Sequence, residues 1–226
     1  IPFSLGSLTV FTFQPFNIFV INFLILPLFF YLIIYIKKKS QSIFRKKPFR
    51  KNLFIFGTSF GFGYYLSGIH WITNSLTFDD TFKILIPFGL IFIPLFLSLF
   101  FSLILVFLGP HLKFNINSIF LLSASLAISD FIRAKIFTGF PWNLWAYSLS
   151  WSPEIIQILN PIGLYALNLI LITIFLVPSV LFFNINLLKK IFSLLTIPLI
   201  IFCLYVYGSY SINQNKKFLN DYNKKF

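Results

Sequence analysis

Long apolar runs constrain this chain more than any other feature of its sequence. A helix that crosses a bilayer needs about 20 consecutive, mostly apolar residues, and in lipid it satisfies its own backbone hydrogen bonds. Runs that match this template cover residues 18–36, 53–76, 84–108, 117–133, 162–184 and 190–209, and residues 1–13 read as the end of a span whose beginning is missing. We therefore expect an all-α fold, a polytopic transmembrane helix bundle with about six full spans plus a truncated first span.

The composition excludes most classes of soluble protein. Charged residues make up 10% of the chain, whereas soluble domains carry about 25%, and the mean hydropathy is +0.89. The net charge of +13 would suggest nucleic-acid binding in a soluble protein, but here many basic residues lie in short loops beside apolar runs. Because that distribution is typical of membrane proteins, we expect no nucleic-acid partner.

The loops between the apolar runs alternate in charge. Residues 37–51 hold Lys and Arg without any acid, which predicts that this loop lies in the cytoplasm. Counting spans from there places residues 134–161 and the tail after Gly208 on the opposite, extracytoplasmic side. We expect a transmembrane helical domain at residues 1–209 and a polar extracytoplasmic tail at residues 210–226, the start of a missing domain.

One polar and aromatic segment interrupts the apolar runs. Residues 138–148 read Thr-Gly-Phe-Pro-Trp-Asn-Leu-Trp-Ala-Tyr-Ser. Trp and Tyr favour the membrane–water interface, and irregular backbone is tolerated there where protein buries it or where it lines a cavity. The segment therefore predicts a shaped interfacial loop, whose candidate lipid-facing residues are Gly139, Phe140, Pro141, Trp142, Trp145 and Tyr147.

Asp130 and Arg133 lie at the end of the 117–133 run, directly before this segment. Residues three apart share a helix face, so the two side chains can form an ion pair. Ionisable groups inside spans are costly and mark functional sites by default, but long cationic side chains often only extend to the interface. We favour an ion pair that stabilises the helix end at the interface over a polar cluster near a lipid headgroup.

Small residues recur along residues 57–68. Gly57 and Gly61 are four apart, and Gly63 and Gly68 follow in the same run. This pattern favours close packing between helices in a membrane. Trp71 comes soon after and predicts that this helix ends near the outer interface.

No catalytic group of residues can be assembled from the sequence. The one cysteine, Cys203, lies in the middle of an apolar run, where a thiol behaves as a small hydrophobic side chain. The two histidines, His70 and His111, are far apart and have no neighbours at ligand spacing. We therefore expect no catalytic residue, no metal site and no cofactor within this chain.

Four parts of the sequence together resemble the membrane domain of the apolipoprotein N-acyltransferase family. The aromatic segment resembles the family's outer-face loop, although a glycine usually occupies the position of Ala146. The other similar parts are a glycine-rich helix ending in Trp, a turn after the first helix and the start of a later span. They correspond to residues 60–71, to Phe13-Gln14-Pro15-Phe16, and to Pro161-Ile162-Gly163 with Asn168.

The resemblance implies an enzyme of the bacterial inner membrane that finishes lipoproteins. Such an enzyme moves an acyl chain from a membrane phospholipid to the N-terminal cysteine amine of a diacylated lipoprotein, which are its expected partners. The family's chemistry belongs to a periplasmic nitrilase-like domain with a Glu-Lys-Cys triad, none of which can be carried over to this chain. Because the aromatic segment is predicted on the outer face, we hypothesise that it forms part of the floor beneath that active site through Phe140, Pro141, Trp142, Trp145 and Tyr147.

Two other functions stay open at this point. One is a non-catalytic membrane scaffold of the same fold, which would anchor a separately encoded catalytic domain. The other is an unrelated transporter, which should show broken helices with polar groups at mid-membrane. Beyond the prolines and Asn168, few residues fit that description, so we rank the transporter last.

Overall fold

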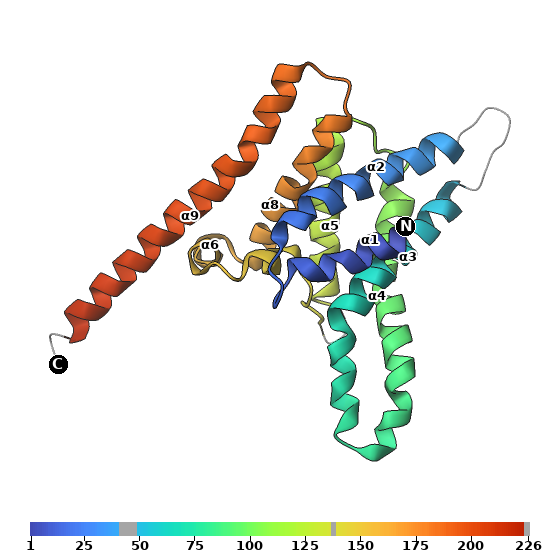
Figure 1. The fold of residues 1–226 in the computed structure, drawn as a ribbon, viewed down its shortest axis with the longest axis horizontal. Helices are drawn as coiled ribbons and strands as arrows, with labels where there is room; N and C mark the ends of the chain where they lie inside the picture. Colours follow the sequence, from blue (N-terminus) through green and yellow to red (C-terminus); the bar gives the residue numbers. More distant parts are fainter. Residues whose placement is uncertain (41–48, 137–138, 224–226) are drawn as a thin grey trace.

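The computed structural model describes residues 1–40, 49–136 and 139–223, with side chains up to Leu219 (Figure 1). Within these residues all regular structure is helical, so the predicted all-α fold is confirmed. The longer helices are α2 (Asn22–Ser40), α3 (Phe49–Ile69), α4 (Ile86–Leu108), α5 (Ile116–Arg133), α8 (Leu164–Leu176) and α9 (Leu187–Asn223). Short α-helices are α1 (Pro2–Ser7), α6 (Pro153–Ile156) and α7 (Leu159–Ile162). The 3-10 segments are η1 (Leu8–Thr12), η2 (Phe19–Ile21), η3 (His70–Thr77), η4 (Asp80–Leu85), η5 (Trp145–Leu149) and η6 (Val177–Phe182).

Five helical segments of the described chain are long and apolar enough to cross a membrane. They are Phe19–Ser40, Asp80–Leu108, Ile116–Arg133, Leu164–Phe182 and Leu187–Leu219. The expected span at residues 53–76 forms α3 and η3, but it is not among these five. Arg50 and Lys51 lie in the first turn of α3, and small or polar residues fill its middle, so the segment is less apolar. The number of spans therefore stays a prediction.

Aromatic side chains from α2, α3 and α4 fill the centre of the bundle. The ring centroid of Phe29 on α2 lies 4.3 Å from that of Phe60 on α3. Phe60 in turn packs edge-on against Phe101 on α4, with centroids 5.2 Å apart. These rings are buried, and offset or edge-to-face pairs of this kind stabilise a core beyond the area they bury.

The glycines of α3 lie where other elements approach its backbone most closely. A Cβ atom at Gly57 would lie 2.7 Å from the Cα of Ser102 on α4, and one at Gly61 would lie 2.8 Å from the Cα of Ser98. A Cβ at Gly63 would clash with the carbonyl oxygen of Phe3 on α1. Successive glycines thus admit α4 on one side of α3 and α1 on another.

The basic loops that the structure describes gather at one end of the bundle. Lys37, near the end of α2, donates hydrogen bonds to the carbonyl oxygens of Pro110 (2.5 Å) and Leu112 (3.0 Å) in the loop between α4 and α5. The C-terminal ends of α2, α4 and η6 lie toward the top of Figure 1. Residues 41–48, most of the loop predicted to be cytoplasmic, lie outside the described residues.

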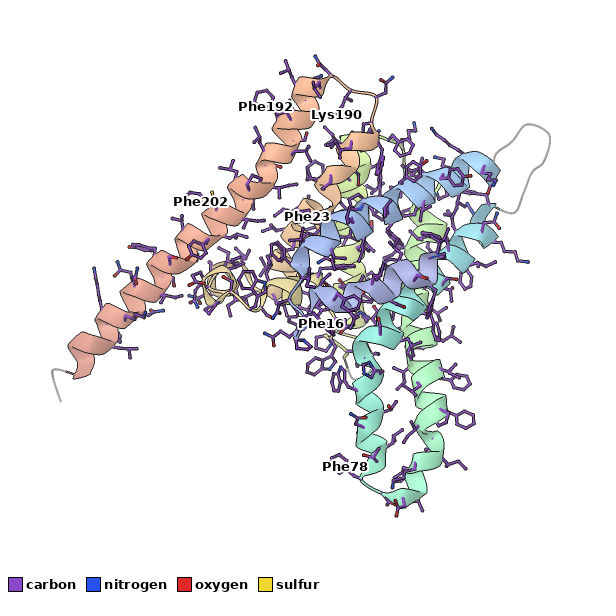
Figure 2. All side chains as sticks on the ribbon, viewed as in Figure 1. Phe16, Phe23, Phe78, Lys190, Phe192 and Phe202 are labelled. Carbon is purple, nitrogen blue, oxygen red and sulfur yellow. The ribbon has the colours of Figure 1, made fainter. Side chains whose placement is uncertain are left out.

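The turn between η3 and η4 and the C-terminal end of α9 lie at the opposite end of the molecule (Figure 1). Phe78, labelled in Figure 2, is at the tip of that turn and is 93% exposed. The long helix α9 leans away from the other helices and contacts mainly α6 and η6. Its large side chains Phe192 and Phe202 are exposed, as expected of a helix that faces lipid or a further domain (Figure 2).

Candidate functional site at the aromatic loop

The aromatic loop, which we define as residues 139–149, connects the end of α5 to α6 at the end of the bundle opposite the basic loops. Its backbone turns sharply at two positions: Gly139 has φ = 78° and Asn143 has φ = 57°. A Cβ at Gly139 would lie 2.8 Å from the carbonyl oxygen of Ala134, so both the backbone conformation and the space require glycine. The neighbouring Phe137 and Thr138 lie outside the described residues.

Arg133 fixes the start of this loop. Its Nη1 donates hydrogen bonds to the carbonyl oxygens of Phe140 (2.6 Å) and Trp142 (2.8 Å). Its Nη2 lies 3.1 Å from Oδ1 of Asp130, one turn earlier on α5. The guanidinium also lies over the ring of Tyr65, 5.4 Å from its centroid. Arg133 therefore binds irregular backbone that has no helix to satisfy its carbonyl groups.

Asn168 on α8 extends this network to the second half of the loop. Its Nδ2 donates to Oδ2 of Asp130 at 2.9 Å, and its Oδ1 accepts from the backbone N–H of Ala146 at 3.1 Å. Asn168 is fully buried, and Arg133 is only 2% exposed. The two halves of the loop are thus hydrogen-bonded to one buried polar network, which is formed by side chains of α5 and α8.

We expected Asp130 and Arg133 to form an ion pair that stabilises a helix end at the membrane interface. The ion pair forms, and both side chains are buried inside the protein, where the pair and its partners also hold the loop. The position at the interface stays a prediction. Burying two charges is expensive unless hydrogen bonds satisfy their remaining polar atoms. Here carbonyl and amide groups of the loop and of Asn168 supply most of those bonds.

The aromatic residues of the loop point in two directions. Trp145 is only 1% exposed and packs against Tyr64 on α3, with ring centroids 5.1 Å apart. It therefore lies in the core and not at the surface. Trp142 is 48% exposed and meets Trp71 edge-on at 5.5 Å, so a residue of η3 and a residue of the loop form one exposed aromatic pair.

A cavity of about 280 Å³ lies beside this tryptophan pair. We call it the outer pocket; residues that line it include Phe13, Gln14, Trp71, Trp142, Asn143 and Tyr147. The loop is held against α3 there, because the Tyr64 hydroxyl donates to the carbonyl oxygen of Asn143. A Cβ at Gly68 would clash with Asn143 Nδ2, so this glycine admits the loop rather than another helix.

The outer pocket offers hydrogen-bond donors between aromatic walls. The Nδ2 of Asn143 is buried and has no acceptor among the described residues. Burial raises the pKa of the Tyr147 hydroxyl above its ordinary value, so this group stays protonated at neutral pH. Such a pocket suits a polar group that carries oxygen acceptors, such as an ester, an amide or a headgroup.

A second cavity of about 450 Å³ lies on the other part of the loop. We call it the side cavity; Phe92, Ile93, Leu97, Phe100, Arg133 and Phe140 are among the residues that line it. The aromatic loop contributes Gly139 and Phe140 to the side cavity, and Trp142, Asn143 and Tyr147 to the outer pocket. One loop, held by Arg133, therefore forms a wall of both.

Among the described residues, no group of three His, Cys, Asp or Glu could hold a metal ion. Cys203 is exposed on α9, within an apolar span. The two cavities beside the loop suit a molecule that is partly apolar and partly polar.

Sequence reasoning did not assign Gln14, Tyr64 or Asn168 to this site. Gln14 and Asn168 stood within segments that resemble the family, and Asn168 was also noted as a polar residue in an apolar run, whereas Tyr64 was not singled out. The periodicity of an apolar run does not say which side chain meets a loop far along the chain. Only the fold brings residues 13–14, 64–71, 142–147 and 168 together.

The chain is similar to one protein family over most of its length. Residues 5–177 match the family model described as the apolipoprotein N-acyltransferase N-terminal domain. This chain is 31% identical to the apolipoprotein N-acyltransferase of Brucella suis biovar 1 over 182 residues, which cover 79% of this chain and 34% of the relative. Identity to the enzyme of the same name from Rhodopseudomonas palustris is 33% over 179 residues, covering 78% of this chain and 32% of the relative. This chain is 40% identical to the apolipoprotein N-acyltransferase of Rickettsia bellii over 119 residues, which cover 52% of this chain and 24% of the relative.

Proposed function

Since the chain belongs to the apolipoprotein N-acyltransferase family, we propose that it forms the membrane part of an enzyme that transfers an acyl chain from phospholipid to a lipoprotein. The acceptor is the N-terminal cysteine amine of a diacylated lipoprotein. The chain spans about a third of the length of the curated relatives that it matches. We therefore assign to it the binding and positioning of lipids, and we assign the transfer step to the nitrilase-like domain that the family resemblance implies.

The observation that carries this proposal is the meeting of three distant segments around the outer pocket. Its lining includes Gln14 from the turn after η1, Trp71 from η3, and Trp142 and Tyr147 from the aromatic loop. These are three of the four segments that resemble the family. Their meeting at one end of the bundle gives a single place where a lipid-anchored substrate can be held.

The residues of this site would act by positioning. Both substrates keep their acyl chains in the bilayer, so their reacting groups are confined to the depth of the headgroups. Holding two reactants at one depth and orientation lowers the entropic barrier between them. In this proposal the tryptophan pair and Tyr147 form the floor beneath the reacting groups, and Arg133 keeps that floor in shape.

The chain is a bacterial membrane protein, and we propose that it lies in the inner membrane. Lys37, Lys113 and Lys190 would then lie on the cytoplasmic side, in accord with the preference of basic residues for that side. The aromatic loop and the residues after Gly208 would lie on the periplasmic side. This orientation places the outer pocket where lipoproteins are finished.

The proposal can be tested with the complete gene product in a bacterial strain depleted of its own enzyme. Mass spectrometry of a diacylated lipoprotein then reports whether its N-terminal cysteine carries a third acyl chain, on the amine. We expect the triacylated form when the gene is expressed and the diacylated form when it is not. A free amine despite stable insertion of the protein would contradict the enzyme and favour a non-catalytic scaffold.

A further inference from the structure

Lysines from three separate segments meet around Phe114, at the end of the bundle opposite the aromatic loop. Phe114 lies in the loop between α4 and α5. Its ring centroid is 6.0 Å from that of Tyr31 on α2 and 6.2 Å from that of Phe183, which follows η6. We call the four lysines that these segments bring together the basic cluster: Lys37 and Lys38 of α2, Lys113 of the α4–α5 loop and Lys190 of α9.

Two of these lysines fix the backbone of the cluster. Lys37 Nζ donates to two carbonyl oxygens of the α4–α5 loop, including that of Leu112, which directly precedes Lys113. Lys190, labelled in Figure 2, donates through Nζ to the carbonyl oxygen of Leu181 in η6 at 3.2 Å. These acceptors are neutral, so both lysines keep their full positive charge.

The other two lysines are exposed and have no carboxylate partner. Lys38 Nζ lies over the Phe114 ring, 4.9 Å from its centroid. Neither Lys38 nor Lys113 forms an ion pair with a described residue. All five acidic residues of the chain belong to other segments. They are Asp79 and Asp80 in the η3–η4 turn, Asp130 near the end of α5, Glu154 in α6 and Asp221 near the end of α9.

The surroundings of the basic cluster restrict the kind of anion that can compensate it. Phosphate oxygens form strong, charge-assisted hydrogen bonds with ammonium groups. Exposed apolar or aromatic side chains lie beside the cluster, namely Tyr35 (45% exposed), Ile116 (41%) and Phe182 (39%). A free phosphate ion would use only the charges of this surface, whereas a lipid would use its hydrocarbon as well.

The charge of the headgroup is restricted too. A choline or ethanolamine headgroup carries its own positive charge, and the basic cluster offers no carboxylate to receive it. A headgroup whose only charge is the phosphate avoids that repulsion. Basic groups between spanning helices are a known form of recognition site for such anionic lipids.

We infer that the basic cluster binds the phosphate of an anionic glycerophospholipid, in the leaflet that this end of the molecule faces. Lys38 and Lys113 contact the phosphate, while Lys37 and Lys190 hold the segments that present them. The bound lipid thereby ties the end of α2, the α4–α5 loop and the start of α9 together. This site lies at the opposite end from the outer pocket, and it needs neither lipoprotein nor acyl transfer.

Photo-crosslinking of the complete protein in phosphatidylcholine vesicles tests this inference. The probe is a trace of phosphatidylglycerol with a diazirine at the headgroup end of one acyl chain, and the matched probe is phosphatidylcholine with the same chain. Peptide mass spectrometry locates the crosslinks. We expect them at residues 31–35, 114–117 and 182–188. Phosphatidylglycerol should label these residues about 25-fold more than phosphatidylcholine, because each of the two contacting lysines contributes about fivefold.

Double variants separate the basic cluster from net charge alone. Lys38→Gln with Lys113→Gln should reduce labelling by phosphatidylglycerol to the level of phosphatidylcholine, and Lys38→Arg with Lys113→Arg should retain the preference. Lys216→Gln with Lys217→Gln is the matched control. It removes the same charge from exposed positions near the end of α9, and it should leave the labelling unchanged.

Equal labelling by the two probes would overturn the inference, and so would equal losses in the two glutamine double variants. Loss of labelling when inorganic phosphate replaces chloride at the same ionic strength would assign the basic cluster to free phosphate instead of lipid. A protein that shows the expected preference but fails to acylate a lipoprotein would contradict the proposed function and leave this inference standing.

Discussion

At the scale of single residues, Arg133 is a buried charged side chain that joins α5 to the aromatic loop and to Tyr65 of α3. The spacing of Asp130 and Arg133 predicts that the two can pair, and they do. The rest of the network could not be predicted, because its partners are backbone carbonyls of an irregular loop and an amide on another helix. The spacing of charged residues shows which side chains on one helix can pair. It does not show which backbone groups from other segments will lie within hydrogen-bond distance of them.

Replacing Arg133 by Gln should destabilise the fold strongly. The change leaves Asp130 buried without its counter-charge, a situation that typically costs about 3–5 kcal/mol. Lys83→Gln provides the matched control, because it removes the exposed Lys83–Asp80 pair, also spaced three apart, and should cost no more than about 1 kcal/mol. Reversible unfolding in mixed micelles, followed by tryptophan fluorescence, measures both free energies.

A double variant sharpens this test. Asp130→Asn combined with Arg133→Gln removes both charges, so it should cost less than the sum of the two single variants. Additive losses, or equal losses for Arg133→Gln and Lys83→Gln, would contradict the role that we give to the buried pair.

At the scale of elements, the contact between α3 and α4 depends on small residues. The spacing of Gly57 and Gly61 predicts close packing, and in the structure both lie against the backbone of α4. The sequence could not say that Gly63 meets α1, or that Gly68 meets the aromatic loop. The spacing of glycines along a helix shows which face of that helix can be approached closely. Which other element packs against that face depends on the whole fold.

Gly61→Ala should loosen the contact between α3 and α4. The added methyl group would lie 2.8 Å from the Cα of Ser98, and overpacking of this kind typically costs about 1–3 kcal/mol. Gly89→Ala on α4 is the matched control, because its methyl group would meet only side-chain atoms, the nearest being Cγ2 of Thr73 at 3.2 Å. Since Ala favours helix over Gly by about 1 kcal/mol, the control should be neutral or stabilising. Thermal unfolding of the two variants in one detergent measures the difference, and equal midpoints would contradict this packing.

Element boundaries were harder to predict than element type. The helix expected at residues 53–76 changes to a 3-10 segment after Ile69, and α9 continues past residue 209 to Asn223. The apolar run of α9 ends before its helix does, because Asn, Lys and Ser residues can continue a helix once it leaves the hydrocarbon. Hydropathy thus predicts where a span ends, not where the helix ends.

At the scale of the whole molecule, the C-terminal end of α2 and the loop between α4 and α5 lie together at one end of the bundle. The aromatic loop, the η3–η4 turn and the end of α9 lie toward the other end. Charged residues occur there too, among them Lys83 of η4 and Arg133, so which end faces the cytoplasm stays a prediction from loop charge. The meeting of the distant segments at the outer pocket needed the fold itself.

Cysteine labelling tests the proposed orientation. In a Cys203→Ser background, single cysteines at Thr77 or Asn213 should react with a membrane-impermeant maleimide when only the outer membrane is permeabilised. Single cysteines at Lys113 or Asn186 should react only after the inner membrane is opened. All four positions are exposed in the structure, so a reversed or uniform pattern would contradict the orientation and could not be explained by burial.

The central claim is that the outer pocket positions lipid substrates for acyl transfer, and Trp142→Ala in the complete enzyme tests it most directly. Trp151→Ala is the matched control, because Trp142 and Trp151 are 48% and 46% exposed and only the first lines the outer pocket. In Trp142→Ala, the rate of lipoprotein N-acylation should fall about tenfold, which corresponds to about 1.4 kcal/mol of lost transition-state stabilisation. In Trp151→Ala, the rate should stay at the wild-type value. Unchanged acyl transfer in a stably inserted Trp142→Ala enzyme would contradict the claim.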